Sequence, residues 1–319
     1  MGYNNVYALD HLRDRLLIDT GPDYDGARAI LSAELERPPT LVVATHAHLD
    51  HAGLGCWWQA QGVPVALGER DFGTARVGAA RFSEAPEWKA FLAFVAASGA
   101  PEDVQAETVV GLERSRDRGR TQSAPGGYSP STDGRWPTAL RYESFEPARP
   151  VADEERLLGG AVTVIVSPGH TPGNLVLTVP TEGWLFSGDQ LLPGITPTPA
   201  IQWEPGSAER FASLPLFFRS MQHLAAMDYT HCFPGHGEPF ENVAEVIALN
   251  IAQIDQRTEK VYDVVRLGPG TLYAICEALY PRALRRRFWP IVATVQGHLD
   301  ILEEDGRVLS AEGQYHVVA

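Results

Sequence analysis

The chain has 319 residues, of which 44% are hydrophobic and 21% are charged, a composition typical of a soluble globular protein with one large domain or one domain and a small appendage. It has 26 Lys and Arg residues against 40 Asp and Glu residues, a formal net charge of −14, so its overall field repels nucleic acid and other polyanions. There is no apolar run of 18 residues, the first five residues lack the pattern of a secretory signal, and the three cysteines are widely spaced. We therefore expect a cytoplasmic protein with no membrane partner and no disulfide framework.

The first third of the chain alternates between strand and helix patterns. Residues 6–9 and 16–19 predict an antiparallel hairpin, and residues 24–35 have helical spacing that ends before Pro38 and Pro39. A short apolar strand at 41–44, a helix at 54–61 and a strand at 63–67 follow. This order predicts an α/β fold.

Four candidate metal ligands lie directly after the strand at 41–44, and they are His46, His48, Asp50 and His51. On an extended strand His46 and His48 point to the same side, and a turn at 52–53 lets the other two face them. A single metal ion would use fewer protein ligands than these four. Nitrogen and carboxylate ligands without thiolate suit zinc, iron(II) or manganese(II), and the spacing disfavours the alternative of a solvated histidine-rich loop.

Residues 72–150 have the pattern of an insertion, whose position predicts a cap over these histidines. Helices are expected at 88–97 and 104–112, and a loop rich in Gly, Pro and Ser at 121–137. Between residues 113 and 142 six Arg oppose three acidic residues, a local charge of +3. A solvated helix face is the preferred explanation, and the alternative is that this charge holds an anionic substrate. The candidate residues for that role are Arg114, Arg116, Arg118 and Arg120.

Three further polar turns follow predicted strands. His170 comes after the strand at 162–166, Asp189 after the strands at 175–179 and 184–186, and His236 after a helix at 210–227 and a strand around Phe233. The remaining histidines have no ligand-like spacing and are expected on the surface or in the core; these are His11, His223, His231, His298 and His316.

The C-terminal residues 243–319 predict a separate small unit after a domain of residues 1–242. A long helix from Val243 ends at Gly268, helices are expected at 271–279 and 284–302, and a hairpin at 307–318. This order is typical of a winged-helix module. Residues 256–319 carry eight basic and eight acidic side chains, so despite the basic run at 285–287 a packing or dimer element is favoured over a reader of nucleic acid.

The segment 45–51 resembles the signature of the metallo-β-lactamase superfamily, and segments 167–173, 187–189 and 234–237 resemble its later motifs in the same order. The resemblance covers about residues 3–240 and implies a four-layer αββα sandwich. The C-terminal module is similar, at 267–272 and 297–308, to that of β-lactamase-like protein 2 and its bacterial relatives.

The resemblance also implies a role for each candidate ligand. His46, His48 and His170 would hold one divalent ion, Asp50, His51 and His236 a second, and Asp189 would bridge them. Zinc is the expected metal, with Fe²⁺ or Mn²⁺ as alternatives, and the bridging hydroxide would be the nucleophile. Asp50 would be the catalytic residue that orients the water or carries a proton, and Asp19 would support a ligand from behind.

These roles predict a binuclear metal-dependent hydrolase acting on a small-molecule ester, thioester or lactone. The alternative is a metal-dependent endoribonuclease of the β-lactamase-like protein 2 type, so nucleic acid stays open as a partner. A third interpretation is a non-hydrolytic di-iron binding or redox protein, which His48 disfavours because the flavodiiron type has Glu within this motif. β-Lactam hydrolysis is disfavoured because the subgroups with a Cys ligand differ from this sequence. A homodimer stays open as well.

Overall fold

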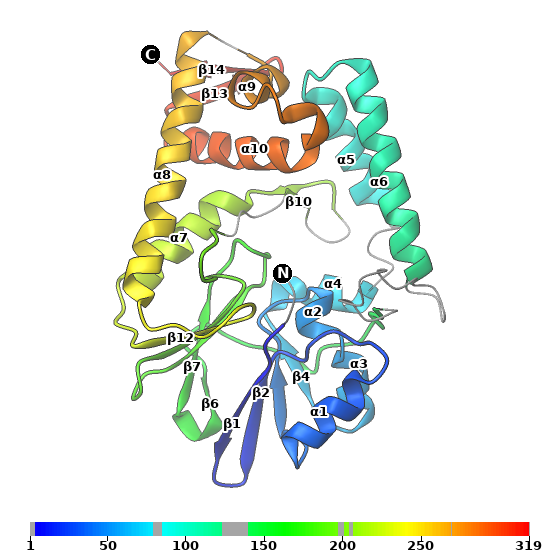
Figure 1. Ribbon diagram of the computed structural model, residues 1–319, viewed down its shortest axis with the longest axis vertical. Coiled ribbons are helices and arrows are strands. Elements are labelled where there is room, and N and C mark those ends of the chain that lie inside the picture. Colours follow the sequence, from blue (N-terminus) through cyan, green and yellow to red (C-terminus); the bar gives the residue numbers. More distant parts are fainter. Residues whose placement is uncertain are drawn as a thin grey trace.

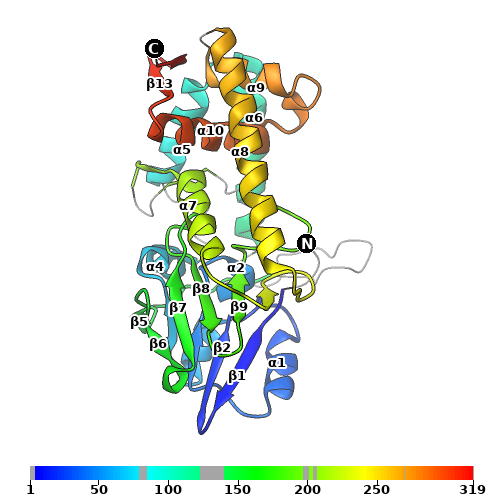
Figure 2. The ribbon, with the colours of Figure 1, turned by 90° about the vertical axis from the view of Figure 1, so that its left-hand side faces the viewer.

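The computed structural model describes residues 4–78, 85–122, 140–196, 201–203, 207–268 and 270–318. Two facing β-sheets form the lower part in Figure 1, and helices of the insertion and of the C-terminal region form the upper part. Helix α8 (Val243–Leu267) runs along both parts in the two views (Figures 1 and 2). Among the described helices none is long and apolar enough to cross a membrane.

The first sheet has the strand order β1-β2-β3-β4-β5, in which β1 and β2 form an antiparallel hairpin and the other neighbours are parallel. Its strands are β1 (Tyr7–His11), β2 (Asp14–Ile18), β3 (Leu41–Val43), β4 (Val65–Leu67) and β5 (Arg149–Pro150). The hairpin and the strands at 41–44 and 63–67 are thus confirmed. Between them lie α1 (Ala27–Leu35), α2 (Leu49–Ala52), α3 (Gly55–Ala60), η1 (Glu69–Asp71) and α4 (Phe72–Val77).

The second sheet has the strand order β12-β9-β8-β7-β6, with β12 parallel to β9 and the other neighbours antiparallel. Its strands are β6 (Arg156–Leu157), β7 (Val162–Val166), β8 (Leu175–Val179), β9 (Trp184–Gly188) and β12 (His231–Pro234). The single-turn helix η3 (Leu158–Gly160) connects β6 to β7, and α7 (Ser213–Ala225) precedes β12.

Successive side chains of each strand pack on opposite faces of its sheet, and the elements therefore form four layers. On β2, Leu16 and Ile18 point into the core between the two sheets, while Leu17 packs with Ala27 and Leu35 of α1 on the outer face. On β8, Leu175 faces the other sheet and Val176 packs against α7 and α8. Both sheets are therefore apolar on both faces, and the result is the expected αββα sandwich.

The structure corrects two predicted helices. The pattern at 210–227 is not one helix, because Arg210–Phe211 form β11, which pairs with β10 (Gln202–Trp203), and α7 begins only at Ser213. The helix expected at 104–112 extends over Glu102–Gln122 as α6. Most of the predicted loop at 121–137 lies outside the described residues, as do the side chains of Arg114, Arg116, Arg118 and Arg120, so the anion-holding role stays untested.

The insertion is shorter than residues 72–150. Ala75 of α4 and Phe145 belong to the core beneath the first sheet, and β5 is an edge strand of that sheet. Helices α5 (Ala85–Ala97) and α6 pack on the C-terminal region instead, where Tyr273 donates its backbone N–H to the carbonyl of Ser98 at 2.8 Å. The chain therefore returns to the sheet before residue 150.

The C-terminal region contains α8, α9 (Leu272–Leu279), η4 (Leu284–Arg286), α10 (Phe288–Glu304) and the hairpin of β13 (Val308–Ala311) with β14 (Gln314–Val317). Its core includes Val261 and Val265 from the second half of α8, whereas Ile247 and Ile254 from the first half belong to the core beneath the second sheet. One helix thus serves two cores, and the predicted boundary at residue 242 does not separate them.

Candidate metal centre

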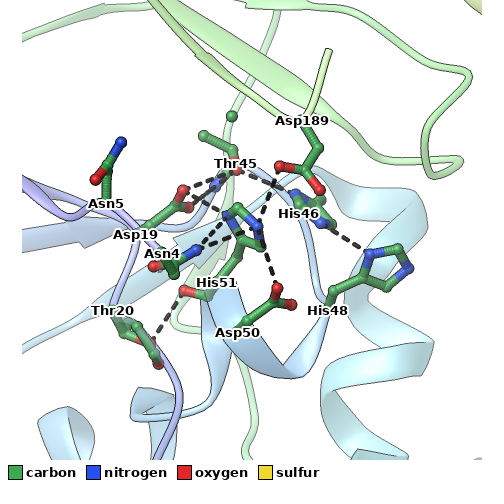
Figure 3. Close-up of polar contacts among 12 residues, drawn as sticks. Asn4, Asn5, Asp19, Thr20, Thr45, His46, His48, Asp50, His51 and Asp189 are labelled. Atoms are coloured by element: carbon green, nitrogen blue, oxygen red, sulfur yellow. Dashed lines mark hydrogen bonds and ion pairs between the residues drawn. The ribbon is translucent and has the colours of Figure 1, made fainter. Parts of the chain in front are cut away.

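The four polar turns meet at one edge of the sandwich, because each follows the carboxyl end of a strand. The turn after β3 carries His46, His48, Asp50 and His51, and the turns after β7, β9 and β12 carry His170, Asp189 and His236. Side chains separated by up to 190 positions lie close together there. Figure 3 shows the part of this cluster around His51.

The local structure of the first turn differs from the prediction. Strand β3 ends at Val43, so His46 and His48 lie in the loop that follows and not on a strand. Helix α2 begins at Leu49 and holds Asp50 and His51 on its single turn. The ligand atoms converge because the loop and the helix fold around one point, not because the side chains alternate along a strand.

Three imidazole nitrogens form the first group. Nδ1 of His48 lies 2.9 Å from Nε2 of His46 and 3.1 Å from Nε2 of His170. These three side chains offer ligand atoms to a single point. Neutral imidazoles that face one another in this way are the common donor set for zinc and iron.

A second group combines two imidazoles with a carboxylate. Oδ2 of Asp50 lies 3.3 Å from Nε2 of His236 and 3.9 Å from Nε2 of His51. His51 is fully buried, whereas the Asp50 side chain keeps 37% of its surface exposed. Asp50 is therefore the member of this group that faces solvent.

Asp189 lies between the two groups and divides its oxygens between them. Oδ2 is 3.5 Å from Nε2 of His170, while Oδ1 is 3.4 Å from Nε2 of His51 and 3.5 Å from Nε2 of His236. Oδ1 is buried and accepts no hydrogen bond from the described residues. A buried carboxylate oxygen without a donor, facing two imidazoles, fits a bridging ligand of two cations.

Gly235 gives these groups room. A Cβ at this position would come within 2.7 Å of Cε1 of His51 and 2.8 Å of Oδ1 of Asp189. The glycine before His236 therefore permits a close backbone approach at this turn.

Burial and neighbouring charges set the protonation states of the candidate ligands. Burial lowers the pKa of His46 and of His170, which keeps them neutral. Burial opposes ionisation of Asp189, but His51 and the other imidazoles overcome it and lower the pKa to about 2. Burial also opposes a charge on His51, yet Asp19 and Asp189 raise its pKa. His51 would have to lose this proton before its Nε2 could bind an ion, so metal binding at this residue depends on pH.

Asp19 orients His51, as the sequence predicted for this carboxylate. Its Oδ2 lies 2.8 Å from Nδ1 of His51, and its Oδ1 accepts the backbone N–H of Thr45 at 2.7 Å (Figure 3). The hydrogen bond leaves Nε2 of His51 to face Asp50 and Asp189. A carboxylate behind a ligating imidazole fixes its tautomer and raises its basicity.

Asp71 is a residue that the sequence analysis missed. Its buried carboxylate accepts the N–H of Ala47 at 2.9 Å, the hydroxyl of Thr171 at 2.7 Å and the N–H of Gly173 at 2.8 Å. It thereby ties the loop of His46 and His48 to the loop of His170. The available signal was its position shortly after β4, at the same edge of the sheet as the ligands.

Two more missed side chains support the first group from outside. Tyr142 donates its hydroxyl to the carbonyl of Ala47 at 2.8 Å, and Gln202 donates Nε2 to the carbonyl of His170 at 2.6 Å. His11, His223, His231, His298 and His316 are in none of the groups of described residues that could hold a metal ion.

Comparison with known proteins agrees with this geometry. The family model described as metallo-beta-lactamase superfamily matches residues 1–236. The probable metallo-hydrolase YqjP of Bacillus subtilis (strain 168) is 30% identical over 148 residues, 46% of each chain. The beta-lactamase-like protein 2 homolog of Drosophila melanogaster is 29% identical over 166 residues, 50% of this chain and 52% of that protein. The chain thus spans about half the length of the curated relatives it matches.

A solved structure extends the similarity to the C-terminal region. The metallo-beta-lactamase family protein TTHA1429 from Thermus thermophilus superposes with a TM-score of 0.72 at 25% identity, over 99% of this chain and 94% of that one. The family model covers most of the chain, including every candidate ligand. The chain therefore belongs to the metallo-beta-lactamase superfamily.

Proposed function

We propose that the protein is a binuclear metal-dependent hydrolase of a small-molecule ester, thioester or lactone. The observation that carries this proposal is the Asp189 carboxylate, which turns one oxygen to His170 and the other to His51 and His236. His46, His48 and His170 would hold the first ion, and Asp50, His51 and His236 would hold the second. The nitrogen-rich donor set favours zinc, and Fe²⁺ or Mn²⁺ are compatible with it.

When bound, two divalent ions would supply a water molecule of lowered pKa and an electrophile to polarise the scissile carbonyl. The protein's own contribution is positioning and proton transfer. Asp50 is partly exposed at the centre, and although burial opposes its charge, His236 and His51 hold its pKa below its ordinary value. As an ionised carboxylate it accepts the proton of the attacking water and passes it to the leaving group.

We further propose that the C-terminal region is a winged-helix module with a packing role. Helix α10 occupies the place of a recognition helix, between α9 and the β13–β14 hairpin. Much of it is buried, and Asp300 near its end pairs with Arg210 of β11. A helix covered in this way offers little surface to a nucleic-acid groove, which supports a small-molecule substrate over RNA.

The first prediction concerns the ligands themselves. His48→Ala and Asp189→Ala should abolish turnover and lower the amount of bound metal, because each variant removes a ligand atom of the proposed centre. Elemental analysis and hydrolysis of a generic thioester and an acyl-lactone measure both effects. His223→Ala is the matched control, because His223 is an exposed histidine of α7 and should keep both properties.

Substrate class is tested in the same metal-loaded preparation with single-stranded RNA. The proposal expects thioester or lactone turnover and no RNA cleavage above the His46→Ala background. RNA degradation that disappears in His46→Ala would establish the nuclease alternative. Full activity in exhaustively demetallated protein would contradict metal-dependent hydrolysis altogether.

A further inference from the structure

A cavity lies between α6 and the start of α10, and none of its lining residues is a candidate metal ligand. It has a volume of about 500 Å³, which falls within the rough range of 300–1,000 Å³ that holds small ligands and cofactors. One wall is the α6 face of Val104, Glu107, Thr108 and Gly111, and the other is the segment Arg285 to Pro290.

The cationic wall is unusual for a protein of net charge −14. Arg285 pairs with Asp103 at 3.1 Å, but Arg286 and Arg287 have no carboxylate within ion-pair distance among the described side chains. The N-cap of α10 makes no side-chain hydrogen bond, so the first N–H groups of this 17-residue helix add to the positive potential. Both guanidinium groups are exposed and available for an anion.

The other lining residues suit a larger ligand better than free phosphate. Glu107 faces the same cavity and repels free phosphate, whereas its carboxylate suits the hydroxyls of a sugar. Phe288 and Trp289 add ring surface, and Trp289 is held edge-to-face by Phe91 at a centroid distance of 4.8 Å. Cations, a hydroxyl acceptor and a fixed indole are three complementary parts of one site.

We propose that this cavity binds a nucleotide. Its phosphates bind Arg286 and Arg287, a ribose hydroxyl donates to Glu107, and the base packs on the ring of Trp289. The site goes beyond the proposed hydrolase function, because binding here needs no turnover. The aromatic contacts continue from Trp289 through Phe91 to Trp203, whose neighbour in the chain, Gln202, supports His170, so a series of packed side chains runs from the cavity toward the metal centre.

Calorimetric titration of the full chain with ADP tests the proposal without reference to activity. Wild-type protein should bind ADP saturably, and the double variant Arg286→Ala/Arg287→Ala should bind it roughly tenfold or more weakly, because two charge-assisted contacts are lost. Lys260→Ala/Arg266→Ala is the matched control. It removes the same charge from exposed residues of α8, outside the cavity, and should leave ADP binding unchanged.

Three results would overturn the assignment. They are no saturable ADP binding to wild type, equal binding by the two double variants, and pyrophosphate binding as tight as ADP, which would leave no role for the ring and sugar. A single-stranded RNA oligomer that binds more tightly than ADP and is lost in the same variant would mean a nucleic-acid site instead. Melting curves of both double variants should match wild type, because the substituted side chains are exposed.

The bound nucleotide is either one end of a carrier substrate or a free ligand, and steady-state kinetics distinguishes these two cases. If it is the end of a carrier substrate, Arg286→Ala/Arg287→Ala should raise KM only for a thioester whose leaving thiol bears an adenine nucleotide. If it is a free ligand, KM for this thioester and for a simple thioester should be equally unaffected while ADP binding is lost. Either result supports the site, and equal KM increases for both thioesters would contradict it.

Discussion

At the scale of single residues, the centre depends on side chains that would never touch a metal ion. Asp71 accepts hydrogen bonds from Ala47, Thr171 and Gly173, and so fixes the backbone on both sides of the first histidine group. Gly173 also leaves no space for a Cβ, which would meet Cγ of Asp71 at 2.9 Å. The carboxylate is thus a positioning residue that acts through two loops.

Asp71→Asn should therefore weaken metal binding by roughly 10- to 100-fold, the usual effect of losing an outer partner of a ligand. The amide has nearly the same size, but its NH₂ group would face N–H donors and leave at least one of them unsatisfied, at a cost of about 1–3 kcal/mol. Competition with a chromophoric chelator measures affinity, and the visible spectrum of the cobalt-substituted protein reports the ligand geometry.

Asp153→Asn is the control for Asp71→Asn, because the exposed Asp153 carboxylate accepts a single backbone N–H, from Val166, at 2.8 Å. It should leave both the chelator competition and the cobalt spectrum unchanged. An Asp71→Asn protein with wild-type affinity and an unaltered spectrum would show that the two loops hold their shape without this carboxylate.

At the scale of elements, local patterns predicted the strands well but not what the helices pack against. Strands such as β7 and β8 are short, continuous apolar runs bounded by turns, and each ligand follows one of them, so the rim of ligands was readable in the sequence. Arg210 and Phe211 form a strand because they pair with β10, a contact that helical spacing does not reveal. The partner of α5 and α6 is Tyr273 and its neighbours, more than 150 residues away, which no local pattern encodes.

The contact between α8 and α10 contains a buried histidine with a pH-dependent cost. The hydroxyl of Thr258 donates to the carbonyl of Ile254, so it accepts a hydrogen bond from Nδ1 of His298 at 2.8 Å. Burial, with a smaller effect of Arg257, lowers the pKa of His298 to about 4. The unfolded chain, with an ordinary pKa of about 6.5, therefore binds a proton that the folded chain does not bind between these values.

Stability should consequently be fully present above pH 6.5 and fall by up to about 1.4 kcal/mol per pH unit from this group as the pH drops toward 4. Denaturant unfolding across this range should show a shallower decline for His298→Asn than for wild type, because Asn does not titrate there. His223→Asn, at an exposed position of α7, should keep the wild-type decline. Parallel curves for wild type and His298→Asn would show that His298 does not carry this cost.

At the scale of the whole molecule, the αββα sandwich and the C-terminal region form one continuous structure. Helix α8 contributes Ile247 and Ile254 to the core beneath the second sheet and Val261 to the upper core. Gly297 of α10 lies against Leu214 of α7, where a Cβ would come within 2.8 Å. The division predicted at residue 242 followed the end of the family resemblance. Sequence similarity does not reveal that α8, which begins after this position, completes the core of the sandwich.

The ion pair between Arg210 of β11 and Asp300 of α10 joins the two parts, with N–O distances of 2.5 and 2.6 Å. Asp300 is buried, and Gln296 donates to its Oδ1 at 2.7 Å. Asp300→Asn leaves a largely buried guanidinium without its counter-charge, so we expect a loss of about 3 kcal/mol in the free energy of unfolding. Glu304 lies on α10 as well, and Glu304→Gln, which breaks its exposed pair with Arg219 of α7, should cost no more than about 1 kcal/mol.

Replacing both partners, as Arg210→Met with Asp300→Leu, should recover most of that loss, because an apolar pair leaves no charge to desolvate. The sandwich and the C-terminal region should unfold together in a single transition in every variant, because α8 and α10 contribute side chains to the cores of both parts. In urea unfolding, tryptophan fluorescence monitors both parts, because Trp58 lies in the sandwich and Trp289 in α10, and retention of bound metal monitors the sandwich alone. Two separate transitions in Asp300→Asn would mean that this ion pair alone couples the two parts. Equal losses of unfolding free energy in Asp300→Asn and Glu304→Gln would mean that burial does not increase the contribution of the Arg210–Asp300 pair.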